Sequence, residues 1–117
     1  MSNQKRVPAR FFETTDGKEP VREWLKSLSP DERRIIGTDI QTVEFGFPIG
    51  MPTCRPMGKG LYEVRSDLPD QKIARVLFCI HDGYMVLLHG FIKKTQKTPK
   101  NDLDLAIKRK KQVEKKK

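Results

Sequence analysis

The stretch that decides the fold is residues 60–100, GLYEVRSDLPDQKIARVLFCIHDGYMVLLHGFIKKTQKTPK. It contains three runs of apolar, β-branched and aromatic residues, at residues 61–66, 72–80 and 84–92, with short polar turns between them. Such runs between turn signals are typical of strands, and hairpin-length links make successive strands antiparallel neighbours. The third run is almost wholly apolar, so we expect it in a central position in the sheet, with helices covering one face.

The chain before this stretch predicts one strand and a helical hairpin. Residues 6–13 mix apolar and charged positions, as an edge strand does. Apolar residues recur at helical spacing over residues 18–29, and we interpret Trp24 as a core anchor of this first helix. The sequence SPDE at residues 29–32 is typical of a capped helix start, so a second helix is expected to run to about residue 45.

Two further segments complete the expected fold. Residues 46–60 are punctuated by proline and glycine, which predicts a loop without regular structure. The sequence TPKN at residues 98–101 breaks the chain and starts a last helix. The predicted order is strand, helix, helix, three strands, helix. This is an α+β fold with an antiparallel sheet, in one domain of residues 1–117 that ends in a basic tail at 111–117.

The positive charge is concentrated near the end of the chain. The net charge is +9, of which residues 91–117 carry +8 and residues 1–90 only +1. Such a patch indicates attraction to a polyanion such as RNA or DNA, with an acidic protein surface as the second candidate. The last three lysines alone are more typical of a solvated tail. No apolar run approaches a membrane span and no secretory signal is present, so a cytoplasmic location is expected.

Metal and disulfide chemistry are not expected. The two histidines and two cysteines lack the spacing of metal ligands, which argues against a zinc site. A disulfide between Cys54 and Cys79 is not expected in a reducing compartment.

Arg75 interrupts an otherwise apolar strand. Burying a guanidinium without a partner is costly, so Arg75 must face water, a partner or a ligand. Two interpretations stay open: a site that binds phosphate, or an ion pair with Glu63 or Asp67 across the sheet.

Other candidate residues lie on the neighbouring strands. Glu63 and Arg65 share one face of a strand, so Glu63 could orient Arg65, act as an acid or base, or form only a surface pair. Lys93 and Lys94 follow the end of the third run, where they could position phosphate or merely form a basic turn. His89 is either a core residue or a general base.

RNA cleavage without a metal makes modest demands on a protein. The 2′-OH of the RNA is the nucleophile, so the protein supplies in-line positioning, a base, an acid and cations for the charged transition state. A cluster of lysines and arginines meets the last of these needs. Further candidate RNA-binding cations flank the strands: Arg55, Lys59, Lys97 and Lys100.

At these residues the chain resembles a known family. The segments GLYEVRSD, KIARVLFCI and LLHGFIKKTQKTPKNDLDLAIKR are similar to the phage-derived Gp49-like, or HigB-like, group within the RelE/ParE superfamily of bacterial toxins. The resemblance covers roughly residues 8–112, and residues 89–99 are its most specific block. It implies a small domain with an antiparallel sheet, a helical hairpin and a C-terminal helix. It also implies ribosome-dependent cleavage of mRNA without metal or cofactor, and neutralisation by a HigA-like helix-turn-helix antitoxin.

The resemblance also implies roles for individual residues. Arg65 matches a basic residue that contacts RNA, and Arg75 matches an arginine that stabilises the scissile phosphate. Lys93 and Lys94 match the basic pair after the last strand.

One role that the resemblance implies has no matching residue. Some relatives place a tyrosine or histidine near the C-terminus, but this sequence has no aromatic residue after Phe91. His89 or Glu63 would then serve as the base, or groups of the ribosomal RNA would.

The expected function is therefore that of a type II toxin that cleaves mRNA on the ribosome, in contact with 16S rRNA. Two alternatives remain: a ParE-like inhibitor of DNA gyrase on the same fold, or a non-catalytic module that binds nucleic acid or a host protein. The basic residues on the strands favour the nuclease, because a gyrase inhibitor has no need to surround a phosphate.

Overall fold

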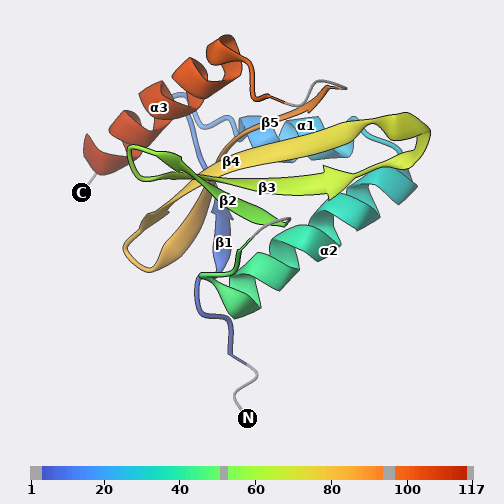
Figure 1. Cartoon of the computed structure of the whole chain (residues 1–117). Helices are drawn as coiled ribbons and strands as arrows, with labels where there is room; N and C mark the ends of the chain where they lie inside the picture. The colour runs from blue at the N-terminus through green and yellow to red at the C-terminus, as the bar shows by residue number, and fades with distance from the viewer. Residues whose placement is uncertain (1–3, 51–52, 94–96, 116–117) are drawn as a thin grey trace.

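The computed structural model describes residues 4–50, 53–93 and 97–115, and these form an α+β domain with a sheet between layers of helix (Figure 1). The helices are α1 (Pro20–Lys26), α2 (Pro30–Gly46) and α3 (Lys100–Lys115), and the strands are β1 (Ala9–Phe11), β2 (Cys54–Gly58), β3 (Leu61–Asp67), β4 (Ile73–His81) and β5 (Tyr84–Lys93). The predicted α+β class and the C-terminal helix are confirmed. No helix in these ranges is long and apolar enough to cross a membrane.

The sheet has the order β1-β5-β4-β3-β2. The three strands predicted from residues 60–100 are antiparallel neighbours, as expected. β1, however, pairs with β5 in parallel, so the prediction of a wholly antiparallel sheet is wrong and the sheet is mixed. Hairpin links fix the direction of strands that follow one another, but β1 and β5 are far apart in sequence and their relative direction is set by packing.

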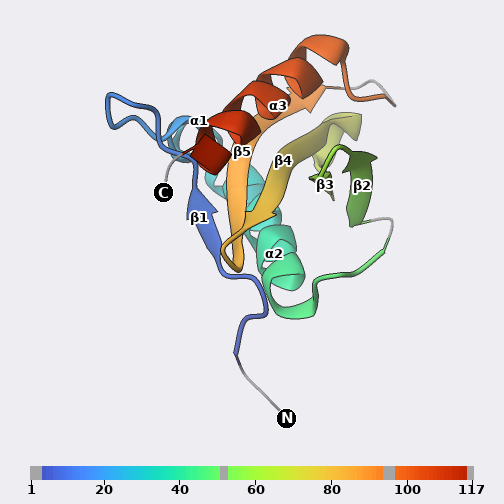
Figure 2. The same ribbon diagram turned by 90° about the vertical axis from the view of Figure 1, so that its left-hand side faces the viewer.

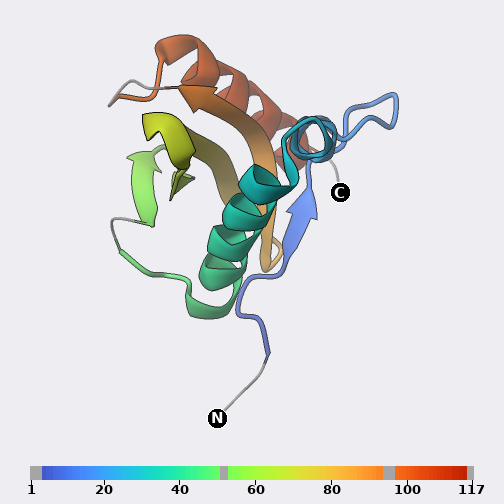
Figure 3. The same cartoon turned by 90° about the vertical axis from the view of Figure 1, so that its right-hand side faces the viewer.

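Helices cover both faces of the sheet, so the prediction that they cover one face is wrong. Helices α1 and α2 pack on one face, where Val21 and Ile36 belong to the same hydrophobic core as Val76 of β4. Helix α3 packs on the other face, where Ala106 meets Leu77. Figures 2 and 3 show α2 and α3 on opposite sides of the twisted sheet. β4 is buried on both faces because each of its two alternating sets of side chains faces a helical layer.

The segment predicted as an irregular loop contains a strand. Cys54–Gly58 forms β2, which pairs antiparallel with β3 at the edge of the sheet. Proline is tolerated at an edge, and the pairing shifts register between Pro56 and Gly58. The proline and glycine residues of this segment argue against a central strand, but they are compatible with an edge strand.

The helical hairpin begins and ends close to the predicted residues. Ser29 Oγ accepts a hydrogen bond from the Glu32 backbone N–H, and Glu32 Oε1 accepts one from the Ser29 N–H, so the predicted capping box is confirmed. The first helix is shorter than predicted, and so is the first strand. Trp24 packs against the core, as predicted.

Helix α3 is tied across β5. Arg109 Nη1 donates a 2.8 Å hydrogen bond to the Leu88 carbonyl, and its guanidinium lies 5.6 Å from the centre of the Phe12 ring. Burial lowers the pKa of Arg109. This docking brings the first turn of α3 against the last residues of β5, and that contact shapes the candidate site.

Candidate functional site

Most of the candidate residues share one face of the sheet, the face that α3 covers. Residues opposite one another on paired strands point to the same side. Arg65 lies opposite Arg75, Arg75 opposite Phe91, and Lys93 opposite Ile73, which is on the same face of β4. The register alone therefore gathers cations from three strands onto one surface.

Glu63 lies at the centre of this surface. Its side chain is 2 % exposed, and Arg55 Nη2 donates to its Oε1 over 3.3 Å. Arg75 Nε lies 3.7 Å from its Oε2, and the Thr98 hydroxyl donates to the same oxygen. One buried carboxylate thus holds together β2, β3, β4 and the segment before α3.

Arg75 is buried beneath this surface. Its side chain is 1 % exposed, and the ion pair with Glu63 is one of the two interpretations that the sequence left open. Burial lowers the pKa of Arg75, the Glu63 carboxylate opposes this effect, and the nearby Arg65 and Arg55 add to it. An arginine stays protonated under these conditions, so Arg75 contributes fixed positive charge from below.

The pairing of Glu63 with Arg65, one of the alternatives that the sequence left open, is not seen. Arg65 Nε instead lies 3.6 Å from Oδ1 of Asp67, whose side chain is exposed, and Arg65 itself is about one-third exposed. The guanidinium of Arg65 is therefore more accessible than that of Arg75.

A second cluster lies at the end of β5. His89 Nε2 is 2.6 Å from Asp102 Oδ1, and Lys93 Nζ is 3.5 Å from Asp102 Oδ2. The Phe91 ring lies near both basic groups, with its centre 5.4 Å from that of His89 and 6.0 Å from Lys93 Nζ. Sequence reasoning missed Asp102, because an acid in the first turn of a helix is commonplace. Nothing local indicates that it meets a strand residue.

The remaining predicted cations do not form one group. Arg55 and Lys97 line a shallow pocket of about 360 Å³ together with Pro56, Met57 and Thr98. Lys59 lies exposed in the turn between β2 and β3, and Lys100 pairs with Asp104 over 2.9 Å on the exposed side of α3. Lys94 lies outside the described residues.

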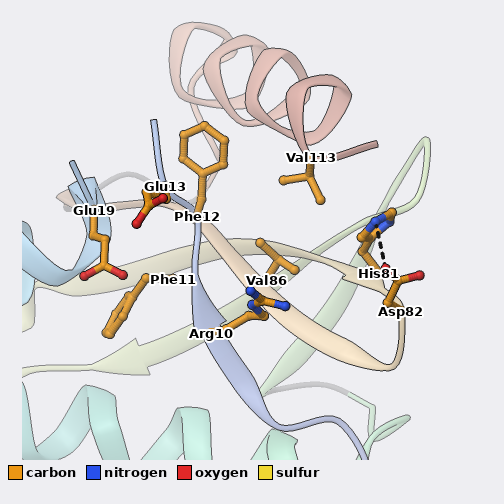
Figure 4. A pocket seen from close by; sticks show the side chains of 9 residues that line it. All are labelled: Arg10, Phe11, Phe12, Glu13, Glu19, His81, Asp82, Val86 and Val113. Atoms are coloured by element: carbon orange, nitrogen blue, oxygen red, sulfur yellow. Dashed lines mark ion pairs between the residues drawn. The ribbon is translucent and has the colours of Figure 1, made fainter. Parts of the chain in front are cut away.

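A larger pocket of about 650 Å³ lies elsewhere, beside β1 and the turn between β4 and β5 (Figure 4). Three carboxylates line it, against one arginine and one histidine, and its other lining residues are apolar. None of the predicted site residues that the structure describes lines it. A surface with this charge balance is poorly suited to a polyanion. Its lining residues are Arg10, Phe11, Phe12, Glu13, Glu19, His81, Asp82, Val86 and Val113.

Neither of the two cysteines is suited to act as a nucleophile. Cys54 and Cys79 are free and buried. Burial raises the pKa of Cys54, and it raises the pKa of Cys79 to about 11, so neither forms a thiolate readily. Within residues 4–50, 53–93 and 97–115, no three His, Cys, Asp or Glu side chains are grouped to hold a metal ion.

The chain matches a known family over a stretch that contains the whole of this site. A family model described as phage-derived protein Gp49-like (DUF891) matches residues 23–111, which run from α1 to the last turns of α3 and include every candidate site residue. No match was found among curated proteins. With three quarters of its length matched, the chain belongs to the family of phage-derived Gp49-like proteins.

Proposed function

We propose that this protein is the toxin of a type II toxin–antitoxin module and cleaves mRNA on the ribosome without a metal ion. The observation that carries the proposal is the convergence of Arg55, Arg65, Arg75, His89 and Lys93, from four strands, on one face of the sheet. A phosphodiester on this face would meet fixed cations that require no rearrangement of the sheet. Membership of the Gp49-like family supports the same reading.

The proposed reaction is transfer of the phosphoryl group to the neighbouring 2′ oxygen. The 2′-OH loses its proton to a base, the 2′-oxygen–phosphorus bond forms, and the phosphorus–5′-oxygen bond breaks as the leaving oxygen takes up a proton. The products are a 2′,3′-cyclic phosphate and a 5′-OH. Arg55, Arg65 and Lys93 are the accessible cations for the phosphorane charge. Arg75 adds charge from beneath and holds Glu63 in place.

His89 is the better supported of the two candidate bases. Both oxygens of Glu63 are engaged by Arg55, Arg75 and Thr98, and the carboxylate is 2 % exposed. With both oxygens engaged and the side chain buried, Glu63 presents no oxygen to a 2′-OH at the surface. His89 retains a ring nitrogen, Nδ1, that Asp102 does not engage.

The proposal includes two partners. The substrate is mRNA on the ribosome, with 16S rRNA beside it, which places the protein in the cytoplasm. A HigA-like helix-turn-helix antitoxin would neutralise the toxin by covering this face. Exposed cations along α3 support the binding of both partners. They are Lys100, Lys108, Lys111 and Lys115.

Inducible expression in bacteria tests the proposal. We expect growth arrest with new mRNA 5′ ends inside translated frames. The double variant Arg65→Ala/Lys93→Ala should abolish both effects. Arg34→Ala, an exposed arginine on α2, should leave both unchanged. The gyrase-inhibitor reading predicts arrest with intact mRNA and altered DNA supercoiling, and a non-catalytic module predicts no new 5′ ends.

A further inference from the structure

The first turn of α3 carries a carboxylate that joins two of the basic groups of β5. Asp102 Oδ1 lies 2.6 Å from His89 Nε2, and Oδ2 lies 3.5 Å from Lys93 Nζ. The side chains of His89 and Asp102 are only 17 % and 14 % exposed. Solvent therefore screens this contact weakly, and the geometry is held by the docking of α3 on the sheet.

This contact dictates which nitrogen of His89 carries the proton. An ionised carboxylate only accepts hydrogen bonds, so Nε2 must be the donor. In the neutral imidazole the lone pair then lies on Nδ1. The Phe91 ring, stacked at an interplanar angle of 27°, restricts rotation of the His89 ring.

The charge of Asp102 has the wrong sign for contact with RNA. A carboxylate beside Lys93 weakens the attraction of this surface for phosphate. A carboxylate at this position is explained if Asp102 acts on the reaction through His89 and Lys93. If Asp102 only held α3 against β5, removing its charge would not be expected to change the rate of RNA cleavage.

We propose that Asp102 is a positioning residue of the proposed ribonuclease: it fixes the tautomer and orientation of His89 and holds Lys93 beside it, without touching the RNA. This inference rests on the proposed function. It predicts that removing the charge of Asp102 slows cleavage without weakening the binding of RNA.

The kinetic experiment compares Asp102→Asn with Asp104→Asn on ribosomes translating a defined mRNA. Asp104 lies on the same helix, carries the same charge and pairs with the exposed Lys100. For Asp102→Asn we expect an unchanged or lower KM and a fall of about 10²-fold in kcat, near the lower end of what acid–base groups contribute. Asp104→Asn should leave kcat unchanged. An unaltered kcat in Asp102→Asn, or equal losses in the two variants, would overturn the proposal.

A double variant separates positioning from a general loss of structure. If Asp102 affects kcat through His89, and its contact with Lys93 bears on RNA binding, then Asp102→Asn should cause no further loss of kcat in a His89→Gln background. Additive losses would mean that Asp102 contributes independently of His89, against the proposal.

The tautomer can be measured without any nuclease activity. The chain has two histidines, so ¹⁵N NMR of the imidazoles is simple, and His81→Gln assigns the signals. We expect His89 in wild-type protein to carry its proton on Nε2 when neutral, and Asp102→Ala to abolish that preference. An Nδ1–H tautomer in wild-type protein would contradict the proposal. If wild-type protein leaves mRNA intact while the tautomer is as expected, the proposed function fails and the His89–Asp102 arrangement stands.

Discussion

Gly90 shows how closely an aromatic ring can approach a strand. A methyl group added at Gly90 would lie 2.4 Å from Cε3 and Cζ3 of the Trp24 ring. The ring belongs to α1, so this contact fixes α1 on β5, beside His89. Glycine is required here by close packing and not by an unusual backbone angle.

Gly90→Ala is therefore expected to lower the free energy of unfolding by about 1–3 kcal/mol, the usual cost of overpacking a core. Urea denaturation measures it. Gly37→Ala is the matched control, because nothing lies within 4 Å of the added group and the site is inside α2. It should be neutral or stabilising by up to about 1 kcal/mol. Equal effects of the two changes would mean that Trp24 does not press on the strand.

Glu63 is the residue on which the buried charges depend. Glu63→Gln removes the carboxylate that faces Arg55 and Arg75, and so breaks the buried ion pair with Arg75. We expect a loss of about 3–5 kcal/mol in the free energy of unfolding. Asp67→Asn removes an exposed carboxylate from Arg65, and should cost less than about 1 kcal/mol. Similar losses in both variants would show that Glu63 contributes no more than a surface charge.

At the scale of elements, the start of α2 links the helical hairpin to the sheet. Glu32 accepts hydrogen bonds from the Ser29 N–H and, over 2.7 Å, from Lys72 Nζ just before β4. Lys72 and the cap lower the pKa of Glu32, and Glu32 raises the pKa of Lys72. These two shifts give the stability contributed by this link a defined dependence on pH.

A carboxyl group whose folded-state pKa is depressed stabilises the fold above its unfolded-state pKa, and that stability is lost as the pH falls through the folded-state value. We therefore expect acid to lower the urea midpoint of the wild-type protein more than that of Glu32→Gln. The raised pKa of Lys72 has the opposite sign, so its contribution is lost only as the pH rises through its alkaline folded-state value. Identical acid dependence in the wild type and Glu32→Gln would show that the link adds nothing.

The elements also show where sequence patterns succeed. The central strands were predictable because apolar runs between turn signals are local features of the sequence. The start of α2 was predictable because a capping box is only four residues long. β2 was missed because proline and glycine mark both loops and edge strands, and only pairing with β3 distinguishes them.

At the scale of the whole molecule, the uneven charge governs encounters with polyanions. The candidate face presents Arg55, Arg65, Lys93 and Lys97, while α1 and α2 cover the opposite face of the sheet. Binding of single-stranded RNA should release counterions from these contacts, so affinity should fall steeply with salt.

Four phosphate contacts predict a slope of about −3 for the logarithm of affinity against that of salt concentration, at roughly −0.7 for each contact. Lys93→Ala should make the slope shallower by about 0.7. Lys26→Ala, at the end of α1, should leave it unchanged. Fluorescence anisotropy with a short RNA across a salt series provides the measurement. A slope insensitive to Lys93→Ala would place RNA binding on another surface.

Much of the candidate site followed from the sequence alone. The sequence by itself determined the α+β class, the three antiparallel strands, the capped start of α2 and the presence of Arg65, Arg75 and Lys93 on neighbouring strands, because strand period and short links are local properties. The tertiary structure alone decided the parallel β1, the burial of Arg75 and the engagement of both Glu63 oxygens. It also decided the pairing of Asp102 with His89, because docking of α3 on the sheet brings these side chains together and no sequence spacing records that docking.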